Sequence, residues 1–108
     1  MVIVSISLSI QLILGMILSV FPKNIFPRKL KQIPGTSREC HRNSCLLWRN
    51  NTNVTIVTGY ALSDDGLWRQ HTWCIMGEEV WESTTRRELY FGYVLNTKEA
   101  EKFYAENI

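Results

Sequence analysis

Three stretches in the middle of the chain are rich in β-branched and aromatic side chains, a composition typical of strands. They are residues 54–61, 67–76 and 79–84. Short polar turns separate them, one at residues 63–66, where an Asp-Gly step suits a hairpin, and one at Gly77 and Glu78. The pattern therefore predicts a three-stranded antiparallel meander at the centre of a domain.

A helix is expected before the meander, over residues 38–49. Its apolar side chains gather in the second half, and its first turn is polar apart from Cys40. Thr36 or Ser37 can serve as the N-cap. The first turn should therefore face solvent or a cleft.

A closing helix is indicated at the C-terminal end of the chain. Asn96 is followed three residues later by Glu99, which is the spacing of a capping box. Ala100, Phe103 and Tyr104 then recur at helical spacing and should pack against the sheet. Residues 36–108 are thus expected to form an α+β domain with an N-terminal helix, a three-stranded antiparallel meander and a C-terminal helix.

The chain begins with an apolar segment, residues 1–21, of a different character. Residues 2–21 carry no charge and are long enough to cross a hydrocarbon layer of about 30 Å as a helix, which predicts a membrane anchor. Serines alternate with apolar residues in part of this run, so a buried strand or an extension is a second interpretation. A cleaved signal peptide is a third, although no basic residue precedes the run.

Residues 22–35 contain three prolines and several basic residues without apolar periodicity, and we interpret them as a linker. Because the basic residues follow the apolar run, the positive-inside rule would place an anchored domain in the cytoplasm. The domain proper is then expected at residues 36–108.

Composition narrows the classes of function. A chain of 108 residues suits one domain, and a hydrophobic content of 45% is ample for a core. The 12 basic residues nearly balance the 10 acidic ones, so nucleic acid is not an expected partner. Three cysteines are too few for a disulfide scaffold and favour a reducing compartment, with one disulfide and one free thiol as the alternative.

His71 and Glu82 fall on the same face of the predicted meander. If Gly77 and Glu78 form a two-residue loop, Trp73 pairs with Glu82 and His71 lies diagonal to it. A carboxylate at that position can hold the imidazole in one tautomer and favour its protonated form. A three-residue loop would move Glu82 to the opposite face, and an ordinary cross-strand polar pair is the simpler alternative.

Cys40 is the cysteine that the pattern places at the start of a helix. There the helix dipole and unpaired N–H groups lower a thiol pKa and can donate to a developing oxyanion. Cys45 lies in the apolar half of the helix, and Cys74 alternates onto the face opposite His71, so both should be buried. We therefore predict Cys40 as nucleophile, His71 as base and Glu82 as orienting acid, with no metal site and no cofactor.

Three polar residues near this trio need an interpretation. Asn43 lies one turn after Cys40 and can either bind substrate or satisfy backbone groups. Arg69 shares the face of His71 and is predicted to bind an acidic group of a substrate, the alternative being an exposed strand arginine that is only solvated. His41 is expected to point away from the partners of Cys40 and to lie at the surface.

A resemblance to known proteins rests on four segments, which are residues 39–44, 59–73, 82–84 and 90–92. They look like a family of small bacterial and phage proteins with no assigned function. More loosely, the strand that carries His71 and Trp73 and the strand that ends in Glu82 resemble the histidine and acid strands of transglutaminase-like and papain-like cysteine enzymes. This second resemblance implies the minimal core of those enzymes as the fold, with Glu82 where they usually have Asp or Asn.

Two functions are compatible with these patterns. The first is a small cysteine hydrolase or acyltransferase that acts on an amide, thioester or isopeptide bond of a peptide or small molecule. The second is a non-catalytic binding or host-interaction module on the same scaffold. The small size of the domain favours the second function, and the order of Cys40, His71 and Glu82 favours the first.

Overall fold

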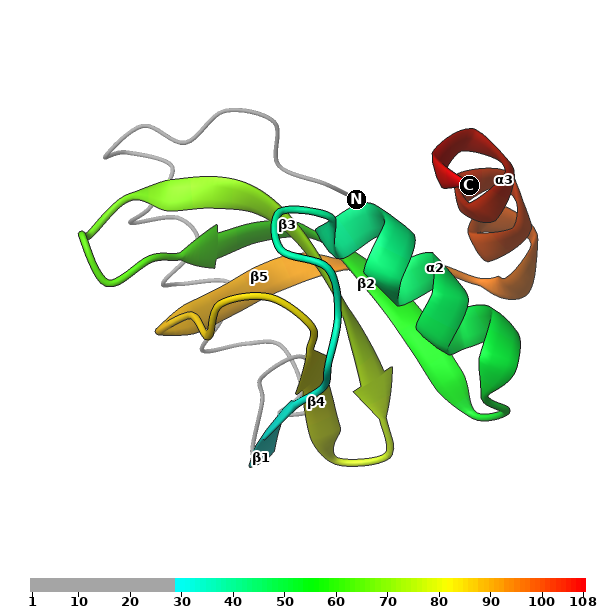
Figure 1. The fold of residues 1–108 in the computed structure, drawn as a ribbon, viewed down its shortest axis with the longest axis horizontal. Helices are drawn as coiled ribbons and strands as arrows, with labels where there is room; N and C mark the ends of the chain where they lie inside the picture. Colours follow the sequence, from blue (N-terminus) through cyan, green and yellow to red (C-terminus); the bar gives the residue numbers. More distant parts are fainter. Residues whose placement is uncertain (1–28) are drawn as a thin grey trace.

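Two helices and one five-stranded mixed sheet make up the described part of the chain, residues 29–108 of a computed structural model (Figure 1). In chain order the elements are β1 (Lys29–Gln32), α2 (Cys40–Asn50), β2 (Val54–Leu62), β3 (Trp68–Met76), β4 (Glu79–Glu82), β5 (Leu89–Val94) and α3 (Thr97–Asn107). The strand order in the sheet is β1-β4-β3-β2-β5. The expected α+β class is confirmed, whereas the sheet is larger than a three-stranded meander.

The central strands β2, β3 and β4 pair antiparallel, as the sequence predicts. Cys74 lies opposite Trp81 and Met76 lies opposite Glu79, so the connection is the two-residue turn that was expected. Gly77 in this turn has a φ of +63°, a left-handed conformation that glycine adopts without strain. The register on which the placement of Glu82 depends is therefore confirmed.

Both edges of the sheet were missed by the sequence analysis. Lys29–Gln32, interpreted as part of a linker, pair in parallel with β4, and Leu89–Val94 pair antiparallel with β2. The strand β1 has no apolar alternation because it lies at an exposed edge, where Leu30 alone packs on the core. Local patterning therefore could not distinguish it from a linker.

Each face of the sheet carries its own hydrophobic cluster. Under the helices, Ile56, Cys74 and Trp81 pack with Cys45 of α2 and Ala100 of α3. Figure 1 shows α2 lying across β2 and β3, with α3 beside it. The opposite cluster consists of Val57, Ala61, Trp73, Val80 and Tyr90. The burial of Cys45 and Cys74 agrees with the expectation that they belong to the core.

The two helices begin in different ways. The side chain of Asn96 accepts a hydrogen bond from the Glu99 N–H, and the Glu99 carboxylate accepts one from the Asn96 N–H, so the predicted capping box of α3 is confirmed. The expected start of α2 was wrong, because its N-cap is Glu39, which makes no side-chain cap. Arg38 precedes it with a φ of +65°. Cys40 is the first residue of α2.

None of the helices in residues 29–108 is long and apolar enough to cross a membrane. The apolar segment of residues 1–21, for which an anchor was expected, lies outside the described residues.

We predict that Gly59→Ala lowers the free energy of unfolding by about 1–3 kcal/mol. Gly59 lies opposite His71 on one side and Gly92 on the other, and a Cβ there would lie 2.5 Å from the Cα of Gly92. Urea denaturation followed by tryptophan fluorescence measures the change. Gly77→Asn is the control, because nothing lies within 4 Å of a Cβ at that turn and asparagine is the non-glycine residue that most readily adopts its positive φ. It should lower stability by at most about 1 kcal/mol, the cost of a left-handed φ for a side chain that tolerates it, and equal losses in both variants would contradict the steric argument.

Candidate active site

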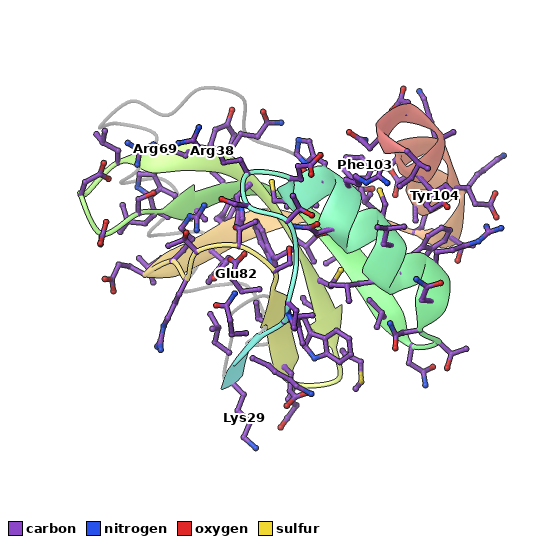
Figure 2. All side chains as sticks on the ribbon, in the orientation of Figure 1. Lys29, Arg38, Arg69, Glu82, Phe103 and Tyr104 are labelled. Atoms are coloured by element: carbon purple, nitrogen blue, oxygen red, sulfur yellow. The ribbon has the colours of Figure 1, made fainter. Side chains whose placement is uncertain are left out.

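Glu82, which is labelled in Figure 2, is the last residue of β4. Its side chain is fully buried. The carboxylate accepts four hydrogen bonds. His71 Nε2 and the Tyr90 hydroxyl donate to Oε1 over 2.7 and 2.8 Å. The N–H and hydroxyl of Thr84 donate to Oε2 over 2.9 and 3.0 Å. Burial on its own would raise the pKa of Glu82, but these donors and the charge of His71 lower it, so the group is a carboxylate.

His71 lies on β3 and is only 1% exposed. Its ring stacks on Trp73, with centroids 5.8 Å apart and planes inclined by 25°. Because Nε2 donates to Glu82, the other ring nitrogen, Nδ1, is left for Cys40. Burial lowers the pKa of His71, but interactions with the Cys40 thiolate and the Glu82 carboxylate outweigh it and raise the pKa. The predicted contact between His71 and Glu82 is confirmed.

Cys40 is half-buried at the first position of α2. Burial raises its pKa, but hydrogen bonding to His41 and His71, the charge of His71 and the Thr72 N–H together lower it to about 6. A thiolate at neutral pH follows, paired with a protonated His71. The structure thus brings together all three residues that the sequence selected for catalysis.

His41 does not lie where the sequence analysis expected it. Its ring is half-buried, with Nδ1 3.8 Å from Cys40 Sγ and 2.6 Å from Thr72 Oγ1. Thr72 is fully buried and also contacts the Thr58 hydroxyl at 2.9 Å. The expectation was wrong because the first turn of α2 already lies against β3, where the half-buried His41 ring reaches Thr72.

A cleft of about 820 Å³ opens beside the thiol. Cys40, His71, Gln32, Arg38, Ser83 and Arg87 are among the residues that line it. Gln32 Nε2 donates to the carbonyl oxygens of Glu82 and Thr84 over 3.0 and 2.6 Å, so its amide fixes the wall of the cleft. A substrate that enters the cleft therefore reaches the sulfur and the imidazole from the same side.

Neither predicted substrate-binding residue lines this cleft. The amide of Asn43 is buried and bonds twice to the Thr36 backbone, over 2.8 Å to the carbonyl and 3.1 Å from the N–H. It holds the segment before α2, which is the alternative that the sequence left open. Arg69 is exposed and forms a two-pronged ion pair with Asp65 over 2.9 and 2.7 Å.

Tyr90, Thr84 and Thr72 contribute to the site without having been predicted. Tyr90 lies on β5, a strand that was not predicted from the sequence, and its hydroxyl completes the shell of Glu82. Thr84 follows Glu82 by two residues, and its hydroxyl donates to the Glu82 carboxylate. The short spacing between a hydroxyl and a buried acid is the local sequence signal that could have indicated this contact. Thr72 adjoins His71 on β3 and donates its N–H to the thiol.

Comparisons with protein-family models, curated proteins and solved structures found no match to this chain. Functional assignment therefore rests on the residues and geometry of the site. Within residues 29–108, no three side chains of metal-binding type are grouped so that they could hold an ion.

We predict that Glu82→Ala lowers the free energy of unfolding by about 3–5 kcal/mol, because it leaves a buried imidazolium and two hydroxyls without an acceptor. Tyr90→Phe removes one donor and should cost about 1–2 kcal/mol. Urea denaturation at neutral pH compares both with the unmodified protein. A Glu82→Ala variant as stable as the original would contradict the assignment of a charged, fully bonded carboxylate.

Proposed function

We propose that this domain is a small cysteine hydrolase or acyltransferase that acts on an amide, thioester or isopeptide bond. The proposal is carried by one observation, the continuous chain of contacts from Cys40 through His71 to Glu82 at the wall of an open cleft. A nucleophile, a base and an orienting acid in this sequence of contacts suit activated-thiol chemistry.

In the proposed reaction, the Cys40 thiolate attacks the carbonyl carbon and a C–S bond forms. Protonated His71 then gives its proton to the leaving nitrogen or sulfur, and the scissile bond breaks. Water or an acceptor nucleophile next loses a proton to His71 and attacks the acyl-enzyme, which releases the acyl group and restores the thiolate and the imidazolium. Glu82 stays ionised throughout and keeps Nε2 of His71 protonated.

The start of α2 supplies a place for the oxyanion. Glu39 provides no side-chain cap, so the first N–H groups of the helix can donate to the oxygen that gains charge as Cys40 attacks. The positive end of the helix dipole adds to this stabilisation.

The wider expectations from the sequence form part of the proposal. The order of a cysteine at a helix start, a histidine on one strand and an acid on the next supports a core like that of papain-like and transglutaminase-like enzymes. All three cysteines are free, which suits a reducing compartment and hence a cytoplasmic domain. Anchoring of this domain to a membrane by residues 1–21 is compatible with that location.

A non-catalytic binding module is the alternative. It is favoured by the closed hydrogen-bond shell of Glu82, which a purely structural polar network would also have.

The reactivity of Cys40 tests the proposal. Alkylation by iodoacetamide should follow a titration with a midpoint at about pH 6, the pKa of the Cys40 thiol. In His71→Ala the midpoint should move up towards the free-thiol value of about 8.5, because the imidazolium is lost. Alkylation rates across pH, with the labelled peptide identified by mass spectrometry, measure the shift.

Cys45 and Cys74 are fully buried, and Cys40→Ser therefore gives the background. His71→Gln, which can still donate to Glu82, replaces the alanine variant if circular dichroism shows that the alanine variant has not folded. A midpoint near 8.5 in the unmodified protein, unchanged by either substitution, would favour the binding module.

A further inference from the structure

Arg87 is a half-buried cation that has no counter-charge among residues 29–108. It lies between β4 and β5 and lines the cleft that contains Cys40 and His71. Two of its three guanidinium nitrogens, Nε and Nη1, are buried and lack a hydrogen-bond partner among the described residues. Leaving such donors unsatisfied costs free energy, and a turn of this half-buried side chain toward an acceptor in the cleft would recover it.

Ser83 provides a second unpaired donor on the same wall. Its side chain is 3% exposed, it lines the cleft, and its hydroxyl has no partner within residues 29–108. Ser83 directly follows Glu82, and the Arg87 N–H donates to the Tyr90 hydroxyl over 3.2 Å. Both residues are therefore held by the shell of Glu82, and they do not depend on a free loop for their positions.

The charge of the cleft fits an anion. Among the described residues that line it are two arginines, Arg38 and Arg87, and no aspartate or glutamate. Arg69 is already neutralised by Asp65. Figure 2 shows Arg38 and Arg69 on the side of the view opposite Phe103 and Tyr104, away from α3. An acceptor for Arg87 thus has to come from outside the described residues.

We propose that the cleft recognises a carboxylate on the substrate, with Arg87 and Ser83 as its donors while Cys40 attacks a nearby acyl group. The proposal rests on the function proposed above and narrows its substrates to acidic peptides or small amides that carry a carboxylate close to the scissile bond. An arginine and a hydroxyl satisfy the oxygens of one carboxylate through charge-assisted hydrogen bonds.

Paired thiol probes test this subsite without a known substrate. The probes are maleimides that carry a carboxylate at the end of a linker arm on the ring nitrogen, in a series of increasing arm length. The rate at which each acid labels Cys40 is compared with the rate for its methyl ester. At the arm length that reaches Arg87, the acid should react faster than its ester. The ratio of acid to ester rates should fall by roughly tenfold in Arg87→Gln, and by a smaller factor in Ser83→Ala.

Arg86→Gln is the matched control, because Arg86 has the same charge, adjoins Arg87 and is exposed outside the cleft. Its ratio should equal that of the unmodified protein. The ratio cancels any change in thiol reactivity that both probes share, and Arg87→Lys, which keeps the charge, should retain part of the preference.

Equal ratios in Arg87→Gln and in the unmodified protein at every arm length would overturn the carboxylate subsite. An equal fall in Arg86→Gln would also overturn it, since general electrostatics would then explain the preference. The methyl esters alone report on the proposed function. Slow ester labelling with an unshifted pH midpoint would reject catalysis, and the acid-to-ester ratio would still measure the subsite.

Discussion

Glu82 carries a negative charge inside the domain, and a buried charge is stable only where donors surround it. The donors come from three places, namely β3, β5 and Thr84, which follows Glu82 by two residues. One carboxylate therefore fixes the ring of His71, the hydroxyl of Tyr90 and the path of the chain as it leaves β4. The walls of the cleft follow from this arrangement, because Ser83 and Arg87 lie on the segment that Glu82 holds.

The access of Cys40 to His71 depends on where the pairing of β4 with β3 ends. The ladder between these strands runs from Met76 to Cys74 and goes no further along β3. The edge of β3 beyond it is open at Thr72, whose N–H donates to the Cys40 thiol. The first residue of α2 thus occupies a position that a longer β4 would close. A short strand, terminated by the side-chain bonds from Thr84 to Glu82, creates room for the nucleophile.

The parts of this site that could be predicted are those that depend on short-range geometry. A two-residue turn at Gly77 sets the register of β3 and β4, and the register places Glu82 beside His71. Tyr90 escaped prediction because its role needs β5 to pair with the far side of β2, which no local pattern encodes. The strand β1 was missed for a similar reason, since its partner β4 lies some fifty residues away and its own side chains are mostly exposed. His41 required knowledge of which face of α2 packs on the sheet.

The unpaired state of Arg87 has a physical cause in the same network. A carboxylate offers about four lone-pair sites, and in Glu82 four donors already fill them. Arg87 touches this network only through its backbone N–H, which donates to Tyr90. Glu82 therefore has no acceptor site left for the guanidinium of Arg87. The charges of Glu82 and His71 compensate each other, and that of Arg87 has no partner among the described residues of the cleft that Cys40 also lines. Because the acceptor sites of Glu82 at the end of β4 are all filled, the guanidinium of Arg87 is left to bind a ligand in the cleft.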